Sequence, residues 1–257
     1  MIRTVAHQFT NHDQGPILRL HRLLAASVLL CHALQAQAAA DNPPATAARD
    51  NEAEQMQLVN AGARLLQEHK PGEAIDNLDK VIAHYKGKNT EKAGTAYCAS
   101  SPAESLVYLV QAAKDKTTAS VYGPTWCDAY YLRGYALIEL GRNGEARASL
   151  ERAVQMSPRN AHYRSELAEL YSRDKNWNEA LATFDASAKI AEESTPQEHR
   201  TAELGRALRG KGFVLVELGR LEEAEAMYRK CLEIDPADTK AMNELRYVQT
   251  RRQQKQP

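Results

Sequence analysis

The sequence has no net charge and few aromatic side chains. Its 257 residues include 33 basic and 33 acidic ones, and aromatic residues make up 6% of the total. No block of like charge occurs along the chain. This argues against a protein that holds a nucleic-acid duplex through a basic surface, but it leaves a peptide or protein ligand open.

Motifs of catalytic and cofactor sites are also missing. The sequence has no H-E-x-x-H, no paired C-x-x-C and no complete G-x-x-x-x-G-K-[ST]. Gly210-Lys211-Gly212 resembles the end of a phosphate-binding loop but falls inside a predicted helix. His162 and Glu166 are four residues apart, yet two such residues without a third ligand do not make a zinc site. We therefore expect no catalysis, no cofactor and no metal.

No apolar run reaches the roughly 20 residues that a membrane-spanning helix needs. The N-terminus instead has basic Arg19 and Arg22, an apolar run over 23–31 and small residues around Ala38. This order is typical of a secretory signal peptide. We expect residues 1–40 to be that signal and the protein to be exported, to a periplasm. The alternative is an ordinary N-terminal helix on a cytoplasmic protein. Residues 41–50, which include two prolines, are predicted to be a flexible leader.

A repeated Glu-Ala pair is the strongest positive signal in the chain. It ends at Ala74, Ala146, Ala180 and Ala224, and Ala146 and Ala180 are 34 residues apart. A period of this length indicates an array of repeated structural units rather than one domain around a single core.

Each unit has the pattern of two helices joined by a tight turn. Apolar residues recur at helical spacing from Asp128 to Leu140 and again from Ala146 to Ala153. Gly141 separates the two blocks and can adopt the left-handed conformation that ends a helix, and Gly219 does the same in a later unit. Pro158 and Pro236 end the second helices, because proline cannot continue helical hydrogen bonding.

The four units resemble the tetratricopeptide repeat. Small residues stand in the first helix, alanines begin the second, and large apolar residues follow one turn later. These positions are Gly62, Gly134, Ala168 and Gly212, then Ala74, Ala146, Ala180 and Ala224, then Leu78, Leu150, Phe184 and Tyr228. Five residues depart from the family pattern: Arg133 and Lys211 replace leucine, Arg164 replaces an aromatic, and Lys86 and Glu192 replace the closing proline. The resemblance implies an all-α fold, a right-handed superhelix of antiparallel helix pairs (an α-solenoid) with a C-terminal capping helix.

The predicted organisation has one regular pair, an interruption and three further units. Residues 51–86 form the first pair, 87–124 form an irregular loop with a single helix that begins at Ser101, and 125–236 form three units. In the last unit a capping box at Thr195 predicts an extended first helix over 196–218. Residues 237–252 are predicted to be the capping helix, with Met242, Leu245 and Val248 on its apolar face, and 253–257 a disordered tail.

Three cysteines remain if the predicted signal is removed. Cys231 stands at a small, buried position of its repeat, so we interpret it as a packed free thiol. Cys98 and Cys127 bracket the irregular helix. In an oxidising compartment they could form a disulfide, but nothing in the sequence fixes the distance between them.

The resemblance also implies the binding surface. In the family, first helices line a concave groove that binds an extended peptide or a helix of a partner protein. Residues matching those positions are Asp128, Tyr131, Tyr135, Glu139, His162, Glu169, Arg173, Arg206, Arg209, Phe213 and Glu217. The alternative for the aromatic residues among them is packing against neighbouring repeats. The lysine and asparagine pattern that clamps a partner's terminal carboxylate is missing, which disfavours a chaperone-tail adaptor.

The predicted function is a non-catalytic scaffold of the bacterial cell envelope that binds another protein, binds no nucleic acid and has no stable membrane span. One alternative is a structural subunit of an envelope complex that self-associates through the helix at 103–114. A less favoured one is an accessory to an envelope hydrolase.

Overall fold

The computed structural model describes residues 45–90 and 94–255. The predicted signal peptide, the start of the leader and the last two residues lie outside this range. Within these ranges, residues 53–90 and 94–255 belong to one compact unit. None of the described helices is both long enough and apolar enough to cross a membrane.

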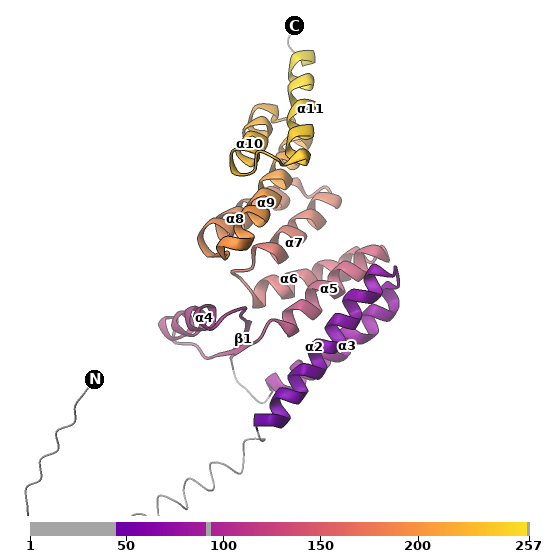
Figure 1. Ribbon diagram of the computed structural model, residues 1–257, viewed down its shortest axis with the longest axis vertical. Helices are drawn as coiled ribbons and strands as arrows, with labels where there is room; N and C mark the ends of the chain where they lie inside the picture. Colours follow the sequence, from indigo (N-terminus) through magenta and orange to yellow (C-terminus); the bar gives the residue numbers. More distant parts are fainter. Residues whose placement is uncertain (1–44, 91–93, 256–257) are drawn as a thin grey trace, which may run out of the picture. The chain divides into compact units, whose positions relative to one another are not determined.

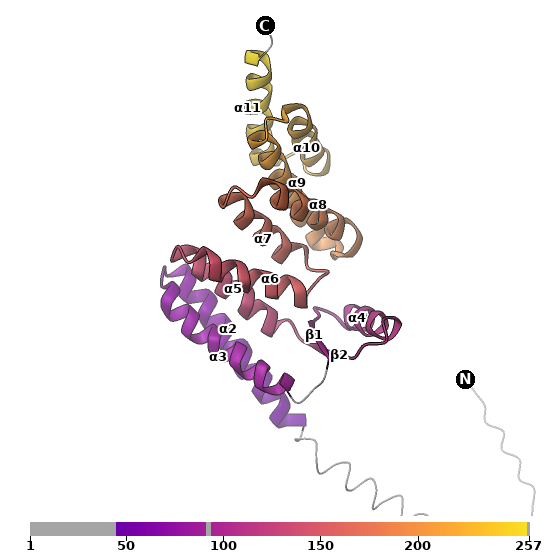
Figure 2. The same cartoon turned by 180° about the vertical axis from the view of Figure 1, so that it is seen from behind.

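Helix pairs make up nearly all of this unit, and successive pairs lie side by side (Figures 1 and 2). The helices are α2 (Ala45–Gln67), α3 (Pro71–Thr90), α5 (Thr125–Glu139), α6 (Asn143–Met156), α7 (Ala161–Arg173), α8 (Trp177–Ser194), α9 (Gln197–Glu217) and α10 (Leu221–Ile234). The four pairs α2–α3, α5–α6, α7–α8 and α9–α10 are the four predicted units. Helix α2 begins at Ala45, within the segment predicted to be a flexible leader.

The two helices of a pair interlock through a small residue on the first and a large one on the second. A Cβ atom added to Gly134 would lie 2.7 Å from Leu150 Cγ, and one added to Gly212 would lie 2.7 Å from Tyr228 Cζ. Gly62 has the same relation to Leu78. Such distances are too short for any side chain, so the missing Cβ is what lets the helices approach this closely.

The turn between the helices has the same geometry in all four pairs. Gly141 and Gly219 have φ of 72° and 76°, as the sequence predicts. At the equivalent places His69 and Lys175 adopt φ of 58° and 60°. In each turn the left-handed residue and its successor donate to two carbonyl groups of the last helical turn, as Lys175 N does to Ser172 O at 3.0 Å.

Proline also explains the helix lengths. Helices α6 and α10 stop one residue before Ser157-Pro158 and Asp235-Pro236 and have 14 residues each. Helices α3 and α8 carry Lys86 and Glu192 in place of the closing proline, and they continue to 20 and 18 residues. The extended helix α9 is confirmed. Its capping box is wrong, because Pro196 is the N-cap and no side chain caps the helix.

Two of the departures from the family pattern make ion pairs between neighbouring helix pairs. Arg133 on α5 donates to Asp79 on α3 through a 2.7 Å hydrogen bond, and Lys211 on α9 pairs with Asp185 on α8. The basic side chains therefore replace an apolar contact by an electrostatic one at the same interface between units.

The irregular segment is a β-α-β insertion rather than a loop with one helix. Strand β1 (Thr95–Cys98) pairs in parallel with β2 (Ala119–Tyr122), Thr95 opposite Ala119, and α4 (Pro102–Lys114) connects them. The start of α4 is as predicted, since the Ser101 side chain accepts from Glu104 N at 3.2 Å. The two strands are the part of the fold that an all-α prediction omits.

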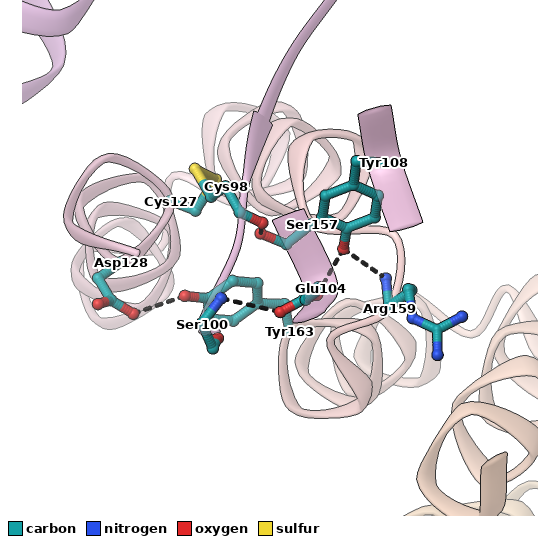
Figure 3. The surroundings of a disulfide bond; sticks show 9 residues. All are labelled: Cys98, Ser100, Glu104, Tyr108, Cys127, Asp128, Ser157, Arg159 and Tyr163. Atoms are coloured by element: carbon teal, nitrogen blue, oxygen red, sulfur yellow. Dashed lines mark hydrogen bonds between the residues drawn. A yellow bond between two sulfur atoms is a disulfide. The ribbon is translucent and has the colours of Figure 1, made fainter. Parts of the chain in front are cut away.

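A disulfide and hydrogen bonds attach this insertion to the array (Figure 3). Cys98 at the end of β1 is bonded to Cys127 in the first turn of α5. Ser157 Oγ donates to Cys98 O at 3.2 Å, and Arg159 N donates to the Tyr108 hydroxyl at 3.4 Å. The insertion is therefore fixed at β1 and again at α4.

The capping helix α11 (Thr239–Lys255) runs further than the predicted 237–252 and includes part of the segment predicted to be disordered. Ala241 and Val248 are fully buried on its inner face. Met242, predicted to belong to that face, is 39% exposed. Arg252 pairs with the buried Glu225 of α10, so the helix is held by charge as well as by apolar contacts.

Two glycines three residues apart should respond to alanine in opposite ways. Gly141 has positive φ, whereas Gly144 lies in α6 with open space around its Cα. We expect Gly141→Ala to lower the free energy of unfolding by about 1 kcal/mol and Gly144→Ala to raise it by about 0.5 kcal/mol. Lys175→Gly should raise it by up to about 1 kcal/mol, since it relieves a left-handed lysine. Urea unfolding followed by circular dichroism measures all three, and equal signs for the two alanines would contradict the assignment.

Removal of the disulfide should destabilise the array. The two cysteines are 29 residues apart in sequence, and loop-closure entropy for that separation corresponds to about 3.5 kcal/mol. We expect Cys98→Ser with Cys127→Ser to lower the free energy of unfolding by about this amount. Reducing agent should lower the stability of the wild type to the level of this variant and leave the variant unchanged. A wild type insensitive to reduction would contradict the bond's contribution.

Candidate partner-binding groove

The largest described hollow lies where α7, α9 and α11 face one another. Its volume is about 860 Å³. A smaller pocket of about 230 Å³ extends it toward α5 and shares Glu169, Arg173 and Arg206 with it. We call these two connected hollows the groove. First helices of three successive pairs contribute to it, which is where the resemblance places the binding surface.

The floor of the groove is aromatic. Phe184 and Tyr228 reach it from the second helices α8 and α10, and both are almost completely buried. Phe184 lies under Gly210, where an added Cβ would be 2.2 Å from the ring. Phe213 stands at the surface, 45% exposed, with its ring edge toward Trp177 at a centroid distance of 6.3 Å. The missing side chain of Gly210 therefore lets the buried Phe184 ring pack directly against the backbone of α9.

The Tyr228 hydroxyl is a polar group without a partner on this floor. The side chain is fully buried, and its oxygen makes no hydrogen bond within the described residues. Burial, together with the nearby Glu244 carboxylate, raises the pKa of Tyr228. The phenol therefore stays protonated.

Arg206 is the centre of a charged network along one wall. Its guanidinium pairs with Glu166 and donates from Nε to Glu169 Oε1 at 3.0 Å. Burial alone would lower the pKa of Arg206, but the two carboxylates outweigh it and raise the pKa. The guanidinium donors of Arg206 are thus bonded to carboxylates of the same chain. Arg206 therefore stabilises the wall of the groove and is not an unpaired cation.

His162 extends this network toward α9 and α5. Its Nδ1 lies 3.2 Å from both Glu203 Oε1 and Arg206 Nη1, and its Nε2 lies 3.1 Å from the Tyr131 hydroxyl. A protonated Nδ1 donates to Glu203, and an unprotonated one accepts from Arg206, so either form of the ring is satisfied.

Asp128 and Tyr131 are used for packing between pairs. Tyr163 donates its hydroxyl hydrogen to Asp128 Oδ1 at 2.5 Å (Figure 3). The Tyr131 and Tyr163 rings are stacked with centroids 5.2 Å apart. Burial raises the pKa of Asp128, and the bond from Tyr163 and the charge of His162 reduce this effect without cancelling it.

Arg209 holds the capping helix. It pairs with Asp238, whose side chain is 8% exposed, just before the start of α11. The contact closes one end of the groove, and loss of the arginine would leave a nearly buried carboxylate unpaired. Arg209 is therefore a structural member of the wall.

Two cations in the groove remain free. Arg173 at the end of α7 and Lys240 at the start of α11 are exposed and have no ion-pair partner among the described residues. Tyr135 is 40% exposed beside Arg173 in the smaller pocket. A ligand can contact these side chains, Phe213 and the exposed Asn243 and Glu244 without breaking a hydrogen bond or ion pair of the described residues.

The structure brings together only part of the predicted set. Six of the eleven residues line the groove: Tyr135, Glu169, Arg173, Arg206, Arg209 and Phe213. His162 lines a separate cavity of about 490 Å³ between α4, α7 and α9. Asp128 and Tyr131 lie in the interface between pairs, and Glu139 and Glu217 are exposed on α5 and α9. The binding role of all eleven stays a prediction.

Ten groove residues were not predicted as members of the binding surface: Ile138, Glu166, Leu170, Ser172, Phe184, Gly210, Tyr228, Lys240, Asn243 and Glu244. Phe184 and Tyr228 occupy core positions of the repeat, and only the neighbouring glycines hinted that they reach the groove. Lys240, Asn243 and Glu244 come from the capping helix. In residues 45–90 and 94–255 no three His, Cys, Asp or Glu side chains gather where they could hold a metal ion.

Comparison with known proteins identifies the repeats. Sequence profiles of the tetratricopeptide repeat match residues 128–160 and 159–237. One curated relative is anaphase-promoting complex subunit 3 of Schizosaccharomyces pombe, 28% identical over 95 residues. That match covers 37% of this chain and 14% of the relative, so the chain spans a small part of the relative's length.

Solved structures show the same fold. PilF of Pseudomonas aeruginosa aligns with a TM-score of 0.55 at 12% identity, over 79% of this chain and 71% of that one. MamA of Desulfovibrio magneticus RS-1 aligns with a TM-score of 0.51 at 17% identity, over 78% and 86%. The chain therefore contains tetratricopeptide repeats and folds as a tetratricopeptide-repeat solenoid.

Asp128→Asn should stabilise the protein in a pH-dependent way. Because the pKa of Asp128 is raised on folding, its ionised form lowers stability at neutral pH, and this cost disappears as pH falls through the raised pKa. Asparagine keeps an acceptor for Tyr163 and carries no charge. We expect the variant to unfold at higher urea concentration than wild type at pH 7, with the difference shrinking toward pH 4. A less stable variant at pH 7 would refute the assignment, and Tyr163→Phe, which removes the donor, should be less stable at both pH values.

Proposed function

We propose that this chain is a non-catalytic scaffold of the bacterial cell envelope that binds a segment of another protein in the groove. The carrying observation is the combination of an aromatic floor with unpaired cations on its rim. Apolar floor residues favour an aliphatic or aromatic side chain of the partner, and Arg173 and Lys240 favour an acidic residue beside it.

The bound segment has one apolar anchor and at least one carboxylate. The anchor packs on the exposed Phe213, beside Gly210 and the buried Phe184. The carboxylate lies between Arg173 and Lys240. This arrangement resembles hot spots in protein interfaces, in which aromatic and arginine side chains surround a small desolvated pocket.

Preorganisation supports a binding role. Arg206 and Arg209 fix the walls through Glu166, Glu169 and Asp238 before any ligand arrives. A rigid groove loses little conformational freedom on binding, so more of the contact energy contributes to affinity.

The envelope location is part of the proposal. The basic, apolar and small residues in order over 19–40 support export. The Cys98–Cys127 disulfide supports an oxidising compartment, since such bonds are rare in the cytosol. The name of the fission yeast relative denotes a subunit of a multiprotein complex, which agrees with a protein-binding role.

The groove can be tested by capture and by charge reversal. A photo-cross-linking residue at Phe213 should capture a distinct envelope protein in cells, and one at Lys189, 72% exposed on α8, should not. With the captured protein in hand, Arg173→Glu with Lys240→Glu should raise its dissociation constant at least about tenfold, because two attractive charges become repulsive.

Lys189→Glu with Lys230→Glu, a double reversal on second helices, serves as the matched control and should leave the dissociation constant unchanged. Equal capture from both cross-linker positions, or unchanged affinity in the groove variant, would refute the proposal. Circular dichroism checks that each variant keeps its helices.

A further inference from the structure

Helix α4 carries large apolar side chains on its exposed side, and one of them, Val107, borders the cavity between α4, α7 and α9. Leu106, Val107, Leu109 and Val110 are 62%, 43%, 45% and 44% exposed. The opposite side is buried through Tyr108 and Ala112, and the Tyr108 ring stacks on Tyr97 at a centroid distance of 4.8 Å. The helix is thus anchored by one side and presents a second apolar side to solvent.

The exposed side forms one continuous surface. At 100° per residue, positions 103, 106, 107, 109, 110 and 113 fall within an arc of about 160°. Within this arc the only charged side chain is Lys114, at the end of the helix. Figures 1 and 2 show α4 standing beside the stacked pairs rather than between them. We call the six side chains on this arc the α4 face. A contiguous apolar surface of this kind marks an interaction site.

The α4 face has a ridge and a hollow next to each other. A hollow of about 620 Å³ lies between α4 and β2, with Leu106 and Leu109 on one side and Val121 and Tyr122 on the other. Val110 lies outside the residues of that hollow, one turn along α4 from Leu106. A surface that contains both a projection and a matching depression can pair with itself around a two-fold axis.

Charge at the ends of α4 favours the same arrangement. Glu104 lies in the first turn, and Lys114, Asp115 and Lys116 lie at the other end, which has a net charge of one positive unit. In an antiparallel pair of α4 helices, each acidic end faces the basic end of the other copy, and the helix dipoles also oppose one another. The centre of the face carries no charge that would select a different partner.

From these observations we propose that the α4 face is the interface between two copies of this chain. The two α4 helices cross antiparallel near position 108, and Val110 of each copy enters the hollow beside Leu106 of the other. The disulfide and the bonds at Ser157 and Arg159 hold the insertion, so the two faces meet as rigid surfaces. The groove lies on α5, α7, α9 and α11, so dimerisation leaves it accessible and does not depend on the proposed ligand.

Sedimentation velocity of the oxidised protein over a range of concentrations tests the dimer. Wild type should pass from monomer to dimer as concentration rises. Leu106→Glu with Val110→Glu should raise the dimer dissociation constant by about 100-fold or more, because it places unpaired carboxylates in an apolar interface. Met56→Glu, at a residue 51% exposed on α2, is the matched control and should behave as wild type.

Cross-linking tests the antiparallel geometry through small substitutions at the two ends of the face, which leave Leu106, Val107, Leu109 and Val110 in place. When Ala103→Cys protein is mixed with Ala113→Cys protein, a short thiol-specific linker should join the two chains, and neither variant alone should cross-link to itself. Efficient self-linking of Ala103→Cys would show a parallel pair and overturn the arrangement.

Three results would overturn the proposal itself. Wild type could remain monomeric at all concentrations, or the Leu106 and Val110 double variant could dimerise as well as wild type. A monomer that floats with phosphatidylglycerol vesicles through the α4 face would assign that face to a lipid surface instead. None of these measurements involves the groove variants, so failure of the dimer and failure of the proposed groove are distinguishable.

Discussion

The close approach of two helices at a residue without a side chain is the contact on which the rest of the structure depends. Gly134 against Leu150 and Gly212 against Tyr228 set the spacing within a pair. That spacing determines which face of each first helix remains for the next pair and which faces the groove. Tyr228 shows the connection directly, since the ring that fills the space at Gly212 is also part of the groove floor.

The helix pairs were predictable because their signals are local. Each small residue, turn glycine and closing proline lies within one or two helical turns of the residue it affects. Strands β1 and β2 were missed because each has four residues and its partner lies 24 positions away, beyond α4. The left-handed turns at His69 and Lys175 were missed for a related reason. There the packing of the pair imposes a conformation that the residue itself disfavours.

The sequence predicted where the candidate site lies, but it could not predict which of its arginines form ion pairs within the chain. The repeat register places Arg173, Arg206 and Arg209 on first helices, and all three line the groove. Whether a given arginine is free depends on carboxylates far away in sequence. Arg206 meets Glu166 and Arg209 meets Asp238, 40 and 29 residues away, whereas Arg173 meets no such group among the described residues. Arginines at similar repeat positions therefore differ in role: some form the groove wall and one can contact a ligand. Only the folded structure shows which is which.

The insertion has a consequence for how such an array can vary. Cys98 and Cys127 have Cα atoms 6.2 Å apart, so the chain leaves the helical stack and returns to it at almost the same point. Helix α4 lies between these two residues and outside the stack, so its length and content can change without altering the register of the pairs on either side. The array can therefore carry a different module at this junction while its groove stays the same. A new interaction surface can therefore evolve in the insertion without changes to the groove.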